Sequence, residues 1–255
     1  MIHPTAIVDP AAAINATARI GPYCIVGADV TIGPETELQH HVTILGPSRI
    51  GSGNFFHAYA SIGQKTQDLK YAGEPTFLEI GDGNTFREFC TVNRGTLPGT
   101  KTVIGSGGNF LAYSHIAHDC IVGDNVIFSN NGTLAGHVEV GHHAVIGGLT
   151  AIHQFCRVGR HAITGGCSKI VQDVPPFFIA DGNPAEIRGV NQVGLERAGF
   201  PAETVRALKE AYRILYRGNL NVKQAVENIR TQLPPLAELA ELCTFIETSQ
   251  RGIIR

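Results

Sequence analysis

The chain has 255 residues, of which only 16% are charged, and its formal net charge is −2 at pH 7. This small charge argues against a non-specific nucleic-acid-binding protein, so we expect no nucleic-acid partner. No apolar run approaches the roughly 18 residues that a membrane span needs. The first residues also lack the basic segment and apolar core of a signal peptide, so we expect neither a span nor a leader.

Bulky apolar residues recur at every sixth position from Ile2 to Ile170. A period of six is neither the 3.6 of an α-helix nor the 2 of an amphipathic strand, and it indicates a solenoid built of short repeats. Four positions in this phase are not apolar: Asp68, Glu74, Pro98 and Thr164.

Each repeat of six (a hexad) is expected to form one short strand and one turn. The second residue of the hexad is often glycine, as in Gly21, Gly123 and Gly159, and glycine permits backbone angles that a tight corner requires. Three strands then make one triangular coil of three hexads, and successive coils stack at the strand spacing of about 4.8 Å. This pattern predicts an all-β solenoid over residues 1–176.

Two segments interrupt the hexads without changing their phase, at about 64–79 and 94–102. The first is polar and ends in Gly-Glu-Pro, which is typical of a protruding loop. Long loops on a rigid scaffold are usually functional. We therefore expect both insertions to mark a binding or catalytic site.

The hexads end near Val174-Pro175-Pro176, and residues 177–255 are expected to form a connecting segment and a small helical domain. Pro201 at a first helical position and Gly218 as a stop predict a helix over 201–217. Asn221 as a cap predicts a second helix over 222–233, and a third is expected over 236–249.

The cysteines contain no C-x-x-C pair, which argues against a metal or disulfide framework. Cys24, Cys90, Cys120 and Cys156 each occupy the same slot, four positions after a register residue. We expect them to be small buried side chains in a stacked layer and the protein to be cytoplasmic.

Because three hexads make one coil, the hexads that start at 116, 134 and 152 lie above one another. They bring together His118, His137 and the pair His153-Gln154. The first insertion begins in the hexad at 62, and the second contains the hexad at 98. Both hexads are a whole number of three-hexad coils away from the hexad at 116. One face of the solenoid is therefore expected to hold the clustered histidines and both insertions.

The residue types in this cluster favour general base catalysis. A histidine titrates near neutral pH, and an adjacent carboxylate can orient it, as Asp119 would for His118. His115 lies three residues before His118 in the sequence. Gly136, just before His137, would present a bare backbone N–H to a developing oxyanion.

Two other hypotheses fit the same fold. Hexapeptide-repeat carbonic anhydrases bind zinc through three histidines, for which His115, His118 and His137 are candidates. A zinc site, however, would leave the helical domain and the 67–70 loop without a role. A purely structural solenoid of the ice-binding kind predicts a regular threonine-rich face without insertions, and the chain has neither.

Seven strings along the chain resemble one family. They are QDLKYAGEPT at 67–76, SHIAHDC at 114–120, NNGTLAGHV at 130–138, IHQFC at 152–156, GGCS at 165–168, QDVPPF at 172–177 and GVN at 189–191. Together they resemble the UDP-N-acetylglucosamine O-acyltransferases, which catalyse the first committed step of lipid A biosynthesis. The resemblance covers essentially the whole chain and implies a left-handed parallel β-helix, a homotrimer and no cofactor or metal.

The resemblance also implies roles for individual residues. His118 would be the general base for the glucosamine 3-hydroxyl, supported by Asp119, and the N–H of Gly136 would bind the oxyanion. The acyl donor would be a (3R)-3-hydroxyacyl thioester of acyl carrier protein. The substrate-binding residues would be Gln67, Asp68 and Lys70, reaching across a trimer interface, His115, His137 and Gln154 in the sugar-nucleotide site, and Asn191 and Arg197 at the nucleotide end.

Some positions bear on specificity. Gly166 matches the position at which the length of the acyl groove is set in the family. A glycine there leaves the groove open and implies a longer acyl chain. Asn93 stands where histidine is frequent, which leaves open an acceptor with a 3-amino group and an amide product. Ala198 and Val193 also depart from the commoner pattern at the nucleotide end.

The later N-acyltransferase of the same pathway resembles this chain in its repeats, but it carries an additional N-terminal domain. The hexads here begin at Ile2, which favours the O-acyltransferases. The predicted helix over 201–217 carries basic residues that could dock an acidic carrier protein: Arg206, Lys209, Arg213 and Arg217.

Overall fold

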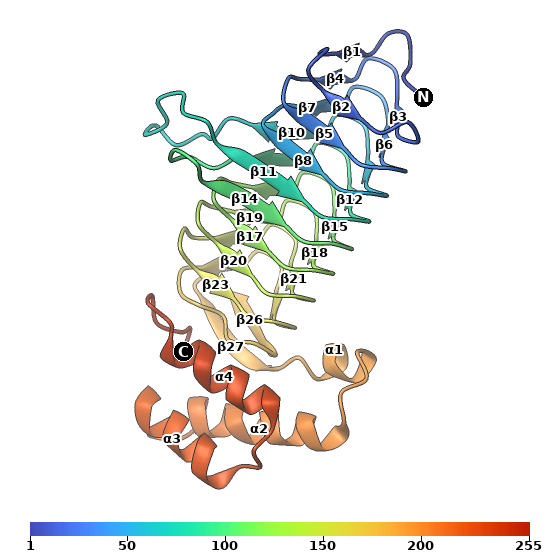
Figure 1. The fold of residues 1–255 in the computed structure, drawn as a ribbon. Coiled ribbons are helices and arrows are strands. Elements are labelled where there is room, and N and C mark those ends of the chain that lie inside the picture. The colour runs from blue at the N-terminus through green and yellow to red at the C-terminus, as the bar shows by residue number, and fades with distance from the viewer.

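A computed structural model describes residues 1–255, and most of its length is a triangular solenoid of short parallel strands (Figure 1). The nine-stranded sheet contains β1 (Ile7–Val8), β4 (Ile25–Val26), β7 (Thr43–Ile44), β10 (Ser61–Gln64), β13 (Thr91–Asn93), β16 (His115–Ile116), β19 (Thr133–Leu134), β22 (Ala151–Ile152) and β25 (Lys169–Ile170). The eight-stranded sheet contains β2 (Ala13–Ile14), β5 (Val30–Ile32), β8 (Ser48–Ile50), β11 (Phe77–Ile80), β14 (Lys101–Ile104), β17 (Ile121–Val122), β20 (Glu139–Val140) and β23 (Arg157–Val158).

The ten-stranded sheet is the third side of the solenoid. It contains β3 (Arg19–Ile20), β6 (Glu37–Leu38), β9 (Phe55–Phe56), β12 (Thr85–Phe86), β15 (Asn109–Phe110), β18 (Ile127–Phe128), β21 (Val145–Ile146), β24 (Ile163–Thr164), β26 (Phe178–Gly182) and β27 (Ala185–Val190). The chain visits the nine-, eight- and ten-stranded sheets in turn, so one coil comprises three strands, as the hexad pattern predicts.

The apolar register residues fill the interior of the solenoid. Ile44 pairs with Ile62 and Ile116 with Leu134, each pair joining successive coils, and all four are at most 1% exposed. On the ten-stranded side, Phe56, Phe86, Phe110 and Phe128 form a buried column with ring centroids 4.6–5.2 Å apart. Burying an aromatic side chain contributes roughly 1.5–3 kcal/mol, so this column is a large part of the core.

Two kinds of residue that looked unusual in the sequence have a place in this interior. Thr164, the polar residue in the register, is buried because its Oγ1 accepts a hydrogen bond from the N–H of Gly147 at 2.9 Å. The four cysteines in the repeated slot are buried, as predicted. Burial raises the pKa of the Cys120 thiol to about 12, which keeps it protonated and inert.

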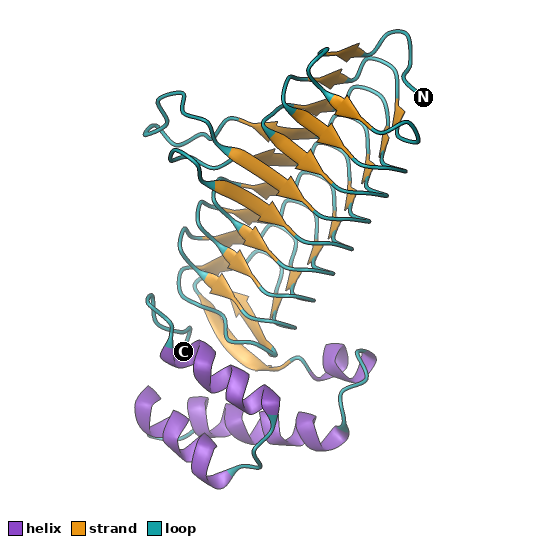
Figure 2. Cartoon of the chain, viewed as in Figure 1, coloured by secondary structure: helices purple, strands orange, loops and turns teal.

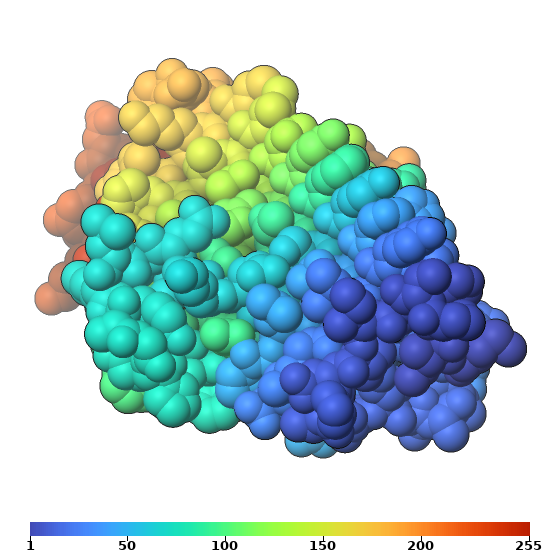
Figure 3. Space-filling view, turned by 90° about the horizontal axis from the view of Figure 1, so that it is seen from above, coloured from blue at the N-terminus to red at the C-terminus, as the bar shows by residue number.

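The two insertions leave the solenoid at the same corner, between the nine- and eight-stranded sheets. The first loop (65–76) connects β10 to β11, and the second (94–100) connects β13 to β14. The insertions lengthen two successive coils, so that Ile62 pairs with Val92 and Val92 with Ile116, each step still a whole number of hexads. The first loop stands out beside the coils in Figures 1 and 3.

One detail of the predicted stacking is wrong. Position 98 lies in the second loop and forms no strand, because the loop adds a hexad between β13 and β14. The neighbour of Ile116 in the coil before is Val92. The expectation that both insertions share the corner with the histidines is nevertheless confirmed, since β10, β13, β16, β19 and β22 are successive strands of one sheet.

Past the hexads, residues 177–190 form β26 and β27 rather than a plain connecting segment, and this antiparallel hairpin extends the ten-stranded sheet. The helices α1 (Gln192–Arg197), α2 (Ala202–Tyr216), α3 (Val222–Gln232) and α4 (Ala237–Glu247) follow at that end (Figure 2). Three of them match the predicted helices, while the short α1 was not predicted. We propose residue 176 as the division between the two parts, because the hexads end there.

The helical end is tied back onto the solenoid. Arg160 forms an ion pair with Glu241 on α4 at 2.8 Å, and the N–H of Ile254 donates to the carbonyl of Asp173 at 2.9 Å. The C-terminal tail thereby lies on the same side as the two loops (Figure 1). None of the four helices has the length and apolar character that crossing a bilayer would require.

Candidate active site

The clustered histidines sit on the corner that carries both loops. In successive coils the equivalent positions are His118, Gly136 and Gln154, and one position later Asp119, His137 and Phe155. His118 is therefore above Gly136, and His137 is its diagonal neighbour, one position off the vertical stack that the sequence suggested. The two rings still meet edge to face with centroids 5.1 Å apart, and Phe155 stacks on His137 at 4.7 Å.

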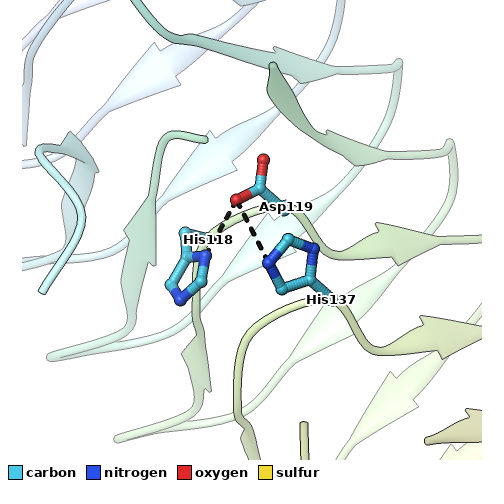
Figure 4. A group of neighbouring side chains, drawn as sticks. All are labelled: His118, Asp119 and His137. Carbon is cyan, nitrogen blue, oxygen red and sulfur yellow. Dashed lines mark hydrogen bonds and ion pairs between the residues drawn. The ribbon is translucent and has the colours of Figure 1, made fainter. Parts of the chain in front are cut away.

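His118 and Asp119 form a closely hydrogen-bonded pair (Figure 4). Nδ1 of His118 lies 2.8 Å from Oδ2 of Asp119, and both side chains are largely buried, with 12% and 6% exposed. An ionised carboxylate only accepts hydrogen bonds, so Nδ1 carries the ring proton and Nε2 is left with a free lone pair. Local geometry therefore prepares Nε2 of His118 to accept a proton.

The turn that holds this pair has an unusual backbone. Asp119, His137 and Phe155 all have positive φ angles of 59–65°, because each closes the same corner in its own coil. Aspartate tolerates this left-handed conformation better than most residues. The backbone thus directs Asp119 back toward the residue before it.

Gly136 lies directly against His118. A Cβ atom at this position would be 2.4 Å from both Cε1 and Nε2 of the imidazole, closer than any real contact. The backbone N–H of Gly136 makes no hydrogen bond within the chain. The absence of a side chain therefore makes room for the base and leaves a free amide beside it.

The first loop places Asp68 on the other side of His118. Oδ2 of Asp68 is 3.9 Å from Nε2 of His118 in the same chain, and its Oδ1 accepts a hydrogen bond from the N–H of Lys70 at 2.9 Å. The loop was expected to reach across a subunit interface, yet Asp68 lies beside the histidine of its own chain. Gln67, Asp68, Thr91 and Asn93 help to line a hollow of about 540 Å³ under the loop.

A second hollow lies on the other side of the pair, toward the C-terminal tail. It measures about 510 Å³ and is lined by Asp119, His137 and Phe155, with Thr248 and Gln250 from the tail. The exposed side chain of Gln154 belongs to the same corner. The two carboxylates nearest to His118 thus line different hollows, Asp68 the first and Asp119 the second, whereas His118 itself lines neither.

His115 precedes this corner on β16, where its Nδ1 lies 2.7 Å from Oγ1 of Thr91. Burial lowers the pKa of His115 below its ordinary value, and the nearby His118 adds to this effect. His115 consequently stays neutral at physiological pH and is suited to hydrogen bonding. Asn93, also buried, donates from Nδ2 to the carbonyl of Lys65 at 3.2 Å, which fastens the base of the first loop.

One group of side chains has the composition of a metal site. Ligand atoms of His118, Asp119 and His137 lie within 4.8 Å of one another. His115, which the zinc hypothesis required, is not part of this group. Moreover, Nδ1 of His118 is already hydrogen-bonded to Asp119. The expectation that the site binds no metal stays a prediction.

The remaining candidate residues lie away from this corner. Gly166 is in the turn from β24 to β25, between the ten- and nine-stranded sheets. Asn191 caps α1 by accepting from the N–H of Gly194 at 3.1 Å, and it donates to the carbonyl of His161 at 2.9 Å. Arg197 is exposed at the end of α1. One chain alone does not bring these three together with His118.

Three threonines near Asp119 were not predicted as part of the site: Thr66, Thr96 and Thr102. Thr102 accepts from the N–H of Asp119 at 2.9 Å, and the N–H of Thr96 donates to Oδ2 of Asp119 at 3.1 Å. All three are at most 5% exposed. All three stand four positions after a register position, in the slot of the buried cysteines, so the repeat indicates their burial but not the hydrogen bonds that they make.

Comparison with known proteins identifies the family to which this chain belongs. The chain is 49% identical over 255 residues to the acyl-[acyl-carrier-protein]–UDP-N-acetylglucosamine O-acyltransferase of Thermodesulfovibrio yellowstonii, covering all of this chain and 99% of the relative. The chain belongs to the UDP-N-acetylglucosamine O-acyltransferase family. Residues 173–254 also match the model for the second domain of UDP-N-acetylglucosamine O-acyltransferase.

Solved structures of other family members have the same fold. The LpxA protein of Acinetobacter baumannii matches with a TM-score of 0.96 and 46% identity, covering 100% of this chain and 99% of that one. The UDP-N-acetylglucosamine acyltransferase of Bacteroides fragilis matches with a TM-score of 0.98 and 37% identity, and both chains are covered completely. The acyltransferase fold therefore extends over the whole chain, loops and helical end included.

Proposed function

We propose that this acyltransferase transfers a (3R)-3-hydroxyacyl chain from acyl carrier protein to the 3-hydroxyl of UDP-N-acetylglucosamine, the first step of lipid A biosynthesis. The observation that carries the proposal is the hydrogen-bonded pair of His118 and Asp119, placed between Asp68 and the free amide of Gly136. Family membership over the full chain supports the acyl donor and the sugar-nucleotide acceptor. The reaction would take place in the cytoplasm.

His118 acts as the general base. Its Nε2 removes the proton of the sugar hydroxyl while the hydroxyl oxygen attacks the thioester carbonyl carbon, and Asp119 stabilises the resulting imidazolium. The carbonyl oxygen becomes an oxyanion that accepts from the N–H of Gly136. Collapse of this intermediate breaks the carbon–sulfur bond, and the carrier-protein thiolate takes the proton back from His118.

The other residues of the corner bind the acceptor. Asp68, with its neighbours Gln67 and Lys70, meets sugar and phosphate groups from the first loop. His115, neutral because it is buried, and His137 and Gln154 supply further hydrogen-bonding groups. Asn191 and Arg197 contribute to the nucleotide end, and Gly166 leaves the acyl groove open.

A homotrimer would assemble this complete site. His118, Gly166 and Asn191 lie on three different corners of one chain, so a site that contains all three needs a second copy. An exposed aromatic ridge runs along the corner of Gly166, formed by Tyr23, His41, Tyr59, Phe89 and Tyr113 with ring centroids 5.0–5.2 Å apart. Its tyrosines and Phe89 are 43–58% exposed, which is typical of an interface.

Acyl carrier protein would dock on the helical end. Arg206, Arg213 and Arg217 are exposed on and just after α2, although Arg213 is paired with Glu210. A basic surface attracts an acidic carrier protein and makes the association rate depend on ionic strength.

The experiment that tests the function is mass analysis of the products formed from UDP-N-acetylglucosamine and a mixed pool of hydroxyacyl carrier proteins. An ester of the expected mass supports the proposal, and the His118→Ala variant serves as a control that should form none. Absence of acylated sugar nucleotide with the wild-type protein would refute the function. A parallel reaction with the 3-amino analogue of the acceptor tests the amide alternative that Asn93 left open.

A further inference from the structure

The second loop (94–100) has no role in the reaction as described, yet its start is deeply buried. Asn93, Arg94 and Thr96 are 4%, 8% and 3% exposed. Surface loops normally leave their polar residues in water, because buried polar groups must find hydrogen-bond partners. The contacts of this segment therefore indicate what it does.

The second loop is fastened at its start to the end of β10 and at its far end to the first loop. The N–H of Arg94 donates to the carbonyl of Gln64 at 2.9 Å, and the guanidinium of Arg94 donates to the carbonyl of Gly63 at 2.9 Å. At the far end, the N–H of Gly99 donates to the carbonyl of Pro75 at 2.9 Å. The two loops thus form one unit rather than two independent excursions.

Thr96 lies at the junction between this unit and the catalytic pair. Its N–H donates to Oδ2 of Asp119 at 3.1 Å, and its hydroxyl donates to Oγ1 of Thr66 at 2.9 Å. Thr66 in turn accepts from the N–H of Asp68 at 3.0 Å. Asp119 and Asp68 are the two carboxylates that flank the His118 ring, at 2.8 and 3.9 Å.

We propose that Thr96 is a positioning residue that sets the two carboxylates on either side of His118 relative to each other. This inference rests on the proposed function and deepens it. Through its N–H, Thr96 orients the carboxylate that holds the base, and through its hydroxyl it fixes the turn that presents Asp68. The base and the substrate are correctly placed only when the two carboxylates keep their relative positions, since a shift of about 1 Å can cost on the order of 100-fold in rate.

The test uses Thr96→Val and Thr66→Val, which keep the β-branched shape and the backbone N–H but remove a hydroxyl. Each is expected to lower kcat/KM for the sugar nucleotide by about 10- to 100-fold. Thr96→Ser, which restores the hydroxyl, should recover most of the activity. Thr100→Val is the matched control, because that hydroxyl donates only to the carbonyl of Leu97 within the same loop.

A double-mutant cycle separates positioning from general damage. Thr66 and Thr96 share one hydrogen bond, and Thr66 also accepts from the N–H of Asp68, so the double variant should be no worse than Thr66→Val alone. Independent losses that multiply, or a Thr96→Val enzyme that keeps more than half of its activity, would overturn the proposal. If Thr96→Val does not fold, Thr66→Val decides the question by the same criterion.

A readout without turnover keeps this inference distinct from the proposed function. The imidazole nitrogen signals of His118 in ¹⁵N NMR spectra should move in Thr96→Val and stay in place in Thr100→Val. A wild-type protein that forms no acylated product would refute the function, whereas unchanged His118 signals in Thr96→Val would refute the positioning role.

Discussion

Gly136 lies so close to His118 that a methyl group at the glycine would be 2.4 Å from Nε2 of the imidazole. The two residues are equivalent positions in successive coils, so the stacking that builds the solenoid also creates this contact. A side chain at position 136 would displace the ring from Asp119. The glycine is therefore explained by packing, in addition to its proposed role toward the oxyanion.

We predict that Gly136→Ala loses at least about 100-fold in kcat, because the methyl group displaces the general base. Steady-state kinetics measure the loss. Gly27→Ala is the control: it lies in a turn between the same two sheets near the N-terminus, and the nearest atom to the added methyl would be Cδ2 of the flexible Leu45 side chain at 3.0 Å. Near-normal activity of Gly136→Ala would show that the ring tolerates a side chain there.

Asp119→Asn should lower kcat by about 10²- to 10⁴-fold with little effect on KM, because the neutral amide no longer stabilises the imidazolium. This substitution should leave the backbone of the turn unchanged, since asparagine also tolerates the positive φ of 59° at this position. The solenoid offers a second aspartate–histidine pair, Asp124 and His142, at 3.2 Å on another corner. Asp124→Asn should therefore leave kcat unchanged, and equal losses in both variants would speak against a catalytic role.

Mixing inactive variants tests whether the site is shared between copies. His118→Ala and Arg197→Ala should each be poorly active alone, because each lacks one residue of the proposed site. Within one chain His118 lies on a solenoid corner and Arg197 lies at the end of α1. Random co-assembly of equal amounts should restore about a quarter of the sites, because one interface then combines both intact residues. A mixture of His118→Ala with Asp119→Asn, both on one corner, should restore none, and the same result for the first mixture would contradict a shared site.

The space beside Gly166 is expected to determine acyl chain length. The nearest atom to a Cβ at this glycine would be the carbonyl oxygen of Gly148 at 3.5 Å, so a larger side chain would project outward without strain. We predict that the wild-type enzyme prefers a longer acyl chain and that Gly166→Leu shifts the preference toward shorter ones. Competition between carrier-protein thioesters of different lengths measures this, and an unchanged preference would remove Gly166 from the groove.

His161 should make the stability of the protein depend on pH. Burial lowers its pKa to about 4, and the nearby His143 and Arg160 add to this effect. Between the ordinary value of 6.5 and pH 4 the unfolded chain binds a proton that the folded chain does not, so stability contributed by His161 is lost as the pH falls through this window.

Thermal unfolding of His161→Phe between about pH 7 and 4.5 tests this effect. The substitution should flatten the decline in Tm, and the ring fits the site because Phe177 takes the equivalent place in the next coil with a φ of 71°. His3→Phe, at an exposed histidine in the first coil and far from His161, is the control. Parallel Tm curves for His161→Phe and wild-type protein would show that other groups cause the acid sensitivity.

The hexad register was sufficient to predict the solenoid and the corner that holds His118. Each coil repeats the same physical problem, which is to bury one apolar residue per strand and turn a corner, so a local pattern determines the long-range neighbours. The register also carried the prediction through both loops, because their lengths preserve its phase. The register did not predict that Val92, rather than position 98, is the neighbour of Ile116, because the second loop adds a hexad between β13 and β14.

Features without a repeat could not be predicted in this way. Thr66 and Thr96 stand four positions after the paired residues Ile62 and Val92, so the repeat relates their positions, but it does not predict the hydrogen bond between their hydroxyls. The β26–β27 hairpin pairs with the solenoid only once, and α1 is too short for a helical pattern to stand out. The clash at Gly136 required the coordinates of a ring in the preceding coil.

The two insertions have a consequence for how such enzymes can diversify. Because each coil touches only the one before and the one after, an added segment that re-enters at the same corner leaves every other layer undisturbed. New substrate-facing segments can then be tried one at a time without repacking the interior. A scaffold of this kind separates the acquisition of specificity from the maintenance of the fold.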